Sequence, residues 1–224
     1  MSMSNKTPTP TIEDYLGVIY TLQRDGEEVY GARLADLLEV SPPTVTVTLR
    51  RMVRDGWIRL DSSKKVFLTK TGILAAKAVI RRHMLTEWML SKILGVPWSE
   101  VHEEADKIEH SISSGVEQSL LQKLKDPELC PHGNPMPGAE AISDSWNPIT
   151  ELKVGEKLII RRIHEFLEDD QELLKFLETH HVIPGNSFIV KEFLPFNKTL
   201  TLINRDEEVT LGFDIAGSIY VEKI

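Results

Sequence analysis

The sequence is poor in cysteine, in long apolar runs and, taken as a whole, in positive charge. Its single cysteine, Cys130, excludes an internal disulfide and is typical of a reducing compartment. No apolar run reaches the roughly 18 residues that a membrane-spanning helix needs, and the chain begins with a polar segment unlike a secretory signal. We therefore predict a cytoplasmic protein that has no membrane partner.

Positive charge is scarce overall but is concentrated in one segment. The 26 Lys and Arg are outnumbered by 34 Asp and Glu, which gives a formal net charge of −8. Residues 50–82 nevertheless hold ten basic residues and two acidic ones, so this segment carries +8 and the rest carries −16. Such a segment indicates a surface that faces phosphate groups, although a solvated helix face gives the same pattern.

The first third of the chain has the order helix, helix, helix, hairpin. Apolar residues recur at helical spacing over 12–22, and a second short helix fits 31–40. Residues 57–72 contain two short strand patterns around a polar turn. With a helix between 41 and 55, this order is that of a winged helix-turn-helix.

The segment SPPTVTVTLRRM, residues 41–52, admits two interpretations. Its alternating Thr and Val are typical of a strand, whereas Ser41 followed by two prolines is typical of the start of a helix. A strand would begin with two prolines and would fail after Leu49. A helix keeps one apolar stripe within about 100° of arc, formed by Val45, Leu49, Met52 and Val53. We therefore predict a helix.

The rest of the chain changes from helical periodicity to strand periodicity near residue 150. One long helix is predicted over 71–95, ending at Gly95, and two more over 99–124. Five short strands with one helix, at 170–180, suggest a small barrel; the strands are 157–163, 187–193, 199–203, 209–213 and 218–224. The predicted fold class is α+β, with a winged helix-turn-helix domain over 1–73, a helical domain over 74–148 and a small β-barrel over 149–224.

The segment VHEEADKIEH carries the most specific chemistry in the sequence. At helical spacing its potential ligands fall within about 100° of arc; they are His102, Asp106, Glu109 and His110. His83 and Glu87, four residues apart, form a second pair on the preceding helix. Histidine and carboxylate groups that converge from two helices suit a divalent transition metal. An exposed polar stripe is the simpler explanation, and for His83 and Glu87 alone it is the better one.

The order and spacing of five segments resemble the diphtheria-toxin-repressor family of metal-dependent transcriptional regulators. These segments are EDYLGVIY, SPPTVTVTLRRMVRDGWI, RRHMLTEWML, VHEEADKIEH and CPHGNPMPG. A C-terminal SH3-like (FeoA-like) domain together with Cys-Pro-His is most similar to the streptococcal-type manganese regulators. The resemblance implies a helical dimerisation domain, a homodimer, and a metal-activated repressor of metal-ion uptake genes that binds a palindromic double-stranded DNA operator.

The resemblance also implies two metal sites. The first would use Asp14, Asp106, Glu109 and His110. The second would use His83, Glu87, His102, Cys130 and His132, completed from the third domain by Asp169 with Glu172 as its neighbour. Iron-type members have Met and Cys in place of Asp14 and Asp106, so hard oxygen ligands here favour Mn²⁺, with Fe²⁺ as the alternative. Cys130 would also admit Zn²⁺. The manganese regulators that lack the third domain have Glu where this chain has Gly17, which argues against a two-metal version of the first site.

For DNA, the resemblance places the exposed side of the 41–55 helix against bases and phosphates. The residues concerned are Ser41, Pro43, Thr44, Thr46, Val47, Arg50 and Arg51, with Lys64 and Lys65 in the wing. Val47, a glutamine in other members, can touch a thymine methyl group but cannot hydrogen-bond a base, so direct readout should be weak.

Two other function classes fit parts of the sequence. A winged-helix regulator that senses a non-metal ligand would leave the His and Asp stripe merely polar. A metal-dependent hydrolase would use the same ligands, but it would leave the basic helix unexplained, and no separate nucleophile or base is evident. We therefore predict that the protein is a regulator and not an enzyme.

Overall fold

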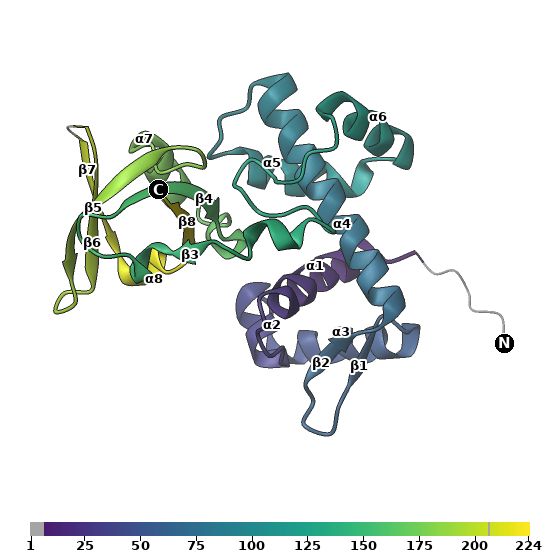
Figure 1. The fold of residues 1–224 in the computed structure, drawn as a ribbon. Helices are drawn as coiled ribbons and strands as arrows, with labels where there is room; N and C mark the ends of the chain where they lie inside the picture. The colour runs from purple at the N-terminus through teal and green to yellow at the C-terminus, as the bar shows by residue number, and fades with distance from the viewer. Residues whose placement is uncertain (1–6, 206) are drawn as a thin grey trace. The chain divides into compact units, whose positions relative to one another are not determined.

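The computed structural model describes residues 7–205 and 207–224, and it divides the chain into two compact units, Met1–Arg82 and His83–Ile224. Figure 1 shows the helices and strands of each unit, and helix α4 (Lys70–Trp88) runs from the first unit into the second. Among the described residues, no helix is both long enough and apolar enough to cross a membrane.

The first unit is a winged helix-turn-helix, as the sequence predicts. Its elements before α4 are α1 (Pro10–Arg24), α2 (Gly31–Leu37), α3 (Pro42–Asp55), β1 (Ile58–Leu60) and β2 (Val66–Leu68). The two strands pair antiparallel, with Ile58 opposite Leu68, and form the wing. The apolar stripe of α1 is fully buried at Leu16, Ile19 and Leu22.

Helix α3 confirms the helical interpretation of the SPPTVTVTLRRM segment. The Ser41 side chain caps it by accepting the Thr44 N–H, and Gly56 ends it in the left-handed region at φ 82°. Val45 and Met52 are buried while Val47 is 65% exposed. Val53, at the margin of the predicted stripe, is instead 41% exposed, so the buried face is narrower than the sequence pattern indicates.

The helical part of the second unit follows α4 with a change of helix type. A π-helix, η1 (Met89–Leu94), continues α4 and ends at Gly95 with φ 72°. Helix α5 (Val101–Ile108) packs Val101 and Ala105 against Leu90 of η1. A 3-10 turn, η2 (Glu109–Ser111), then leads to α6 (Ser114–Leu124). The continuous helical ridge predicted for residues 102–110 therefore stops at Ile108.

The C-terminal part of the second unit is built on one six-stranded antiparallel sheet with the order β3-β8-β4-β5-β6-β7. Its strands are β3 (Asn147–Pro148), β4 (Lys157–Ile163), β5 (Ser187–Leu194), β6 (Thr199–Asn204), β7 (Glu207–Gly212) and β8 (Ile219–Lys223). Helix α7 (Gln171–Thr179) and the short α8 (Phe213–Ala216) belong to the same part, with 3-10 turns η3 (Glu140–Ser143), η4 (Ile149–Glu151) and η5 (Glu165–Leu167). Buried side chains such as Leu158, Ile160 and Val190 form its core, and the short β3 is the one strand that the sequence pattern misses.

Candidate metal centre and DNA-binding surface

Six potential metal ligands from four segments of the second unit meet around Glu87. We call them the Glu87 cluster: His83 and Glu87 on α4, His102 on α5, Cys130 and His132 in the loop after α6, and Glu168 after η5. Glu87 and His132 are completely buried, and Cys130 and Glu168 are nearly so. His83 and Glu87 come together because four residues make about one helical turn.

The spacing of the donor atoms suits one metal ion. Glu87 Oε1 lies 3.3 Å from His83 Nε2, 3.3 Å from His102 Nδ1 and 3.2 Å from His132 Nδ1. Glu168 Oε2 lies 2.8 Å from His102 Nδ1 and 3.4 Å from His132 Nδ1. Ligand atoms bound about 2.1 Å from a metal are about 3 Å apart in neighbouring octahedral positions. The cluster therefore has the dimensions of a coordination shell.

Two buried atoms of the cluster lack ordinary hydrogen-bond partners. His132 Nε2–H donates to the Trp98 carbonyl oxygen at 3.1 Å, which turns Nδ1 toward the carboxylates of Glu87 and Glu168. Within the described residues, neither His132 Nδ1 nor Glu87 Oε2 has a hydrogen-bond partner. Buried polar atoms are almost always satisfied, so a cation bound by Glu87 Oε2, and by His132 Nδ1 in its deprotonated form, fits this donor set.

The protonation states of the cluster are shifted by burial and by its opposite charges. Burial disfavours charge on His83, but the neighbouring carboxylates, Glu87 above all, raise its pKa well above the ordinary value. Burial also opposes charge on Glu87, yet His132 and His83 lower its pKa well below the usual range. For Cys130, burial and then the two carboxylates raise the pKa of the thiol. A metal ion would therefore have to displace protons from this cluster.

The outer nitrogen of His83 faces two of the carboxylates predicted as ligands of the other site. His83 Nδ1 lies 2.6 Å from Glu109 Oε2 and 3.2 Å from Asp106 Oδ1. A histidine that binds metal through one nitrogen commonly donates the other N–H to a carboxylate, so this contact orients His83 toward Glu87. His110 Nε2 lies 3.7 Å from Glu109 Oε1. Asp14 belongs to α1 of the first unit, and its grouping with these residues stays a prediction.

The acid that groups with the cluster from the C-terminal part is Glu168, which is not among the residues predicted from the sequence, and metal binding by Asp169 or Glu172 stays a prediction. Asp169 is 67% exposed and reaches only the far side of His102, with Oδ1 3.4 Å from Nε2. Glu172 is exposed on α7. Three consecutive acids, Glu168 to Asp170, signal an acidic ligand here, but only the turn η5 determines which of them points inward.

The polar side of α3 is exposed as the sequence predicts. Exposed residues on α3 and at the wing are Ser41, Pro43, Thr44, Thr46, Val47, Arg50, Arg51 and Lys64. Part of this hydrogen-bonding capacity is used within the helix, because Thr46 Oγ1 donates to the Pro42 carbonyl at 3.0 Å. Lys65 is half-buried, and its ammonium lies 2.9 Å from Glu28 Oε1.

Three family models match successive parts of the chain and together span most of it. Residues 8–66 match the N-terminal DNA-binding domain of the iron-dependent repressors, 69–138 their metal-binding and dimerisation domain, and 147–223 the FeoA domain. The iron-dependent repressor IdeR of Mycobacterium leprae is 37% identical, covering 96% of this chain and 97% of its own. The diphtheria toxin repressor of Corynebacterium diphtheriae is 34% identical with the same coverage. A manganese-dependent transcriptional repressor solved with manganese is 29% identical, with a TM-score of 0.82 over 95% of this chain and all of its own.

Proposed function

Because the chain belongs to the iron-dependent repressor family, which includes the diphtheria toxin repressor, we propose that it is a manganese-activated repressor of metal-ion uptake genes. The members of this family are metal-dependent DNA-binding transcriptional repressors and not enzymes. The observation that carries the metal dependence is the Glu87 cluster, in which two buried carboxylates and three imidazoles converge. We place this activity in the cytoplasm.

The Glu87 cluster would hold one divalent cation through His83, Glu87, His102, His132 and Glu168, with Cys130 as a further ligand. In holding a cation, these residues would have their carboxylate charge neutralised and their four segments fixed against one another, which would favour one conformation of the second unit. His83 is oriented for this by Glu109, and His132 by the Trp98 carbonyl. The chain's own residues thus supply both the ligands and their orientation.

A second site would join Asp14 to Asp106, Glu109 and His110. Asp14 belongs to the DNA-binding domain, whereas the other three belong to the dimerisation domain in the division 1–73, 74–148 and 149–224. A cation bound by all four would couple metal binding to the placement of α3, whose two copies in a dimer must be about 34 Å apart to enter successive major grooves. Metal would then act as an effector that selects the DNA-binding arrangement.

Manganese is the metal we propose because Asp14 and Asp106 offer oxygen ligands. Manganese prefers carboxylate oxygen, whereas sulfur ligands favour softer metals. Iron is the second candidate, since the curated relatives are iron-dependent repressors. The Cys130 thiolate gives the Glu87 cluster one soft ligand, so zinc would also bind there.

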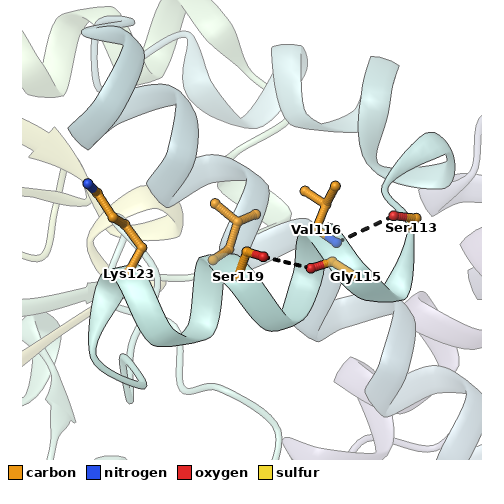
Figure 2. Close-up of a pocket in the computed structure, with 6 residues that line it drawn as sticks. Ser113, Gly115, Val116, Ser119 and Lys123 are labelled. Carbon is orange, nitrogen blue, oxygen red and sulfur yellow. Dashed lines mark hydrogen bonds between the residues drawn. The ribbon is translucent and has the colours of Figure 1, made fainter.

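We propose that a homodimer forms through the helical domain, with α6 in the contact. Figure 2 shows Val116 and Lys123 projecting from α6 beside Ser119. This face lines a hollow of about 480 Å³ together with Gly115 and Leu120. Val116 is 42% exposed, and Ser119 Oγ is turned back onto the Gly115 carbonyl at 2.9 Å. An apolar surface with its hydroxyl satisfied suits a second copy of the chain.

DNA contact is assigned to the exposed side of α3 and to the wing. Arg50, Arg51, Lys64 and Lys65 would bind phosphates, and Val47 would touch thymine methyl groups. Most of the affinity would then come from the DNA backbone. The palindromic operator follows from the two-fold symmetry of the proposed dimer.

The decisive experiment is a DNA-binding titration with Mn²⁺, Fe²⁺, Zn²⁺ or a chelator, on duplex DNA selected from a random pool by the Mn²⁺-loaded protein. We expect tight binding with Mn²⁺ and loss of binding on chelation. Equal binding after chelation would overturn the proposal. Asp106→Ala should abolish the metal response, whereas Glu103→Ala, on the same helix and similarly exposed (51% against 55%), should keep it.

A further inference from the structure

We propose that Asn134 and Arg162 are positioning residues that hold Glu168 in the Glu87 cluster so that it offers the metal a single oxygen. The inference rests on the proposed metal binding by this cluster and adds the residues that set its geometry. Neither residue is a potential metal ligand here, because the Asn134 amide oxygen accepts a hydrogen bond from Arg162 and Arg162 is itself a cation.

A chain of hydrogen bonds runs from Arg162 to the carboxylate of Glu168. Arg162 Nε–H donates to Asn134 Oδ1 at 2.5 Å. The Asn134 amide in turn donates both to Glu168 Oε1 and to the Ile163 carbonyl, the latter at 2.8 Å. Glu168 Oε1 is thereby occupied, while Oε2 faces His102 and His132. The two oxygens of one carboxylate therefore have different partners.

All three residues linked by these hydrogen bonds are buried. Asn134 is fully buried, and Arg162 and Glu168 are each 4% exposed. Arg162 is fixed from two further sides, since its guanidinium lies 2.8 Å from Glu165 Oε2 and 4.9 Å from the centre of the Tyr220 ring. Buried hydrogen bonds that involve a charged group are strong, and an unsatisfied partner is costly. The arrangement of Glu168 is therefore held firmly.

The backbone of the turn that carries Asn134 is fixed against β4, the strand that carries Arg162. The Ile163 N–H donates to the His132 carbonyl at 2.8 Å, and the Cys130 N–H to the Asn134 carbonyl at 2.8 Å. Gly133 has φ 89°, and a Cβ there would lie 1.9 Å from the Arg161 carbonyl oxygen, so only glycine permits this approach. The turn that presents Cys130 and His132 is thus attached to β4, from which Arg162 also comes.

The hydrogen bond from Asn134 to Glu168 should affect how the cluster binds a metal. A carboxylate whose second oxygen is held by an amide binds through one oxygen, which limits the number of ligands and favours one coordination geometry. If Asn134 released Oε1, Glu168 could bind through both oxygens or turn away. Groups that orient the ligands typically change metal affinity about 10–100-fold when they are lost.

The chain offers matched variants for a test. Asn134→Asp keeps the size of the side chain and the acceptor for Arg162 but removes the donor to Glu168. Arg162→Leu removes the guanidinium, and Arg162→Lys restores its charge. Arg161→Leu is the control, because Arg161 is the neighbouring residue on β4 and pairs with Glu222, with Nε 2.8 Å from Oε2.

The measurements use Co²⁺ as a spectroscopic probe in the full-length protein. Co²⁺ affinity is obtained by competition with a chelator, the visible absorption spectrum reports the coordination geometry, and thermal unfolding of the metal-free protein reports stability. We expect Asn134→Asp and Arg162→Leu to weaken Co²⁺ binding roughly 10–100-fold and to change the spectrum. Arg162→Lys should recover part of the affinity, and Arg161→Leu should match the wild type.

A double-mutant cycle separates positioning from a merely structural role. If Asn134 acts through Glu168, Asn134→Asp should have no further effect on Co²⁺ affinity once Glu168 is replaced by Ala. A full additional loss in that background, or unchanged affinity and spectrum in both the Asn134 and the Arg162 variants, overturns the inference. If the wild-type protein takes up no Co²⁺, it is the proposed metal function that fails.

Discussion

The DNA-binding unit and the Glu87 cluster use charge in opposite ways. On the DNA-binding unit, the basic side chains of Arg50, Arg51 and Lys64 are exposed. In the second, Glu87 and Glu168 are buried among imidazoles. Exposed charges act weakly and almost independently, and salt screens them. Buried carboxylates cost several kcal/mol each unless their neighbours compensate. DNA affinity should therefore be a sum of small terms, whereas metal binding should depend on every member of the cluster.

The strongest test of this comparison is Glu87→Gln. The change keeps the shape of the side chain but removes the charge that lies about equally close to three imidazoles. We expect Mn²⁺ affinity to fall by more than about 100-fold and DNA binding to lose its response to metal. Isothermal titration with Mn²⁺ measures the first effect and gel shifts the second. The exposed Glu103→Gln on α5 is the control, and a variant at Glu87 that still responds to metal would contradict the assignment.

Replacing Cys130 by Ser should separate the metals. The change removes the one soft ligand of the cluster at nearly constant volume, so Zn²⁺ affinity should fall roughly 10–100-fold while Mn²⁺ affinity changes less. Competition titrations with each metal measure the two effects. Because burial keeps the thiol protonated in the metal-free protein, stability without metal should change little. Equal losses for both metals would show that Cys130 has a packing role.

The smallest expected effect is that of Arg51→Ala on the DNA-binding surface. Loss of one phosphate contact should weaken binding to selected and random DNA alike, by several-fold, and should lower the slope of log K against log salt by about 1. Fluorescence anisotropy at several salt concentrations measures both. Val47→Ala is the matched control on α3, since it should reduce selectivity without changing the salt slope. A loss confined to the selected DNA after Arg51→Ala would refute the phosphate role.

The fold was largely predictable because its local signals agree with its packing. Ser41, the two prolines and Gly56 define α3 through capping and backbone preference, which are properties of the local sequence. Local sequence also predicts the end of the long helix at Gly95 and the strands, in which apolar and polar residues alternate. The change to a π-helix at Met89 and the end of α5 at Ile108 were missed, since both depend on packing.

The candidate metal centre was predictable only in part. Spacing pairs His83 with Glu87 and groups His102 with Asp106 on its own helix, because residues one turn apart share a helix face, but only the family resemblance joins His83, Glu87 and His102 in one predicted site. The choice of Glu168 over Asp169 depends on the turn η5 and on the bond from Asn134, which lies 34 residues away in sequence. No periodicity connects residues across such a distance.

The sequence by itself determined the order of the elements, the exposed basic helix and most of the ligand types, because capping, periodicity and donor chemistry are local. Only the tertiary structure decided which acid enters the cluster, which oxygen it presents and what holds it there. The reason is physical: a buried carboxylate is placed by hydrogen bonds from distant segments, and these form only when the turn at Gly133 packs on β4.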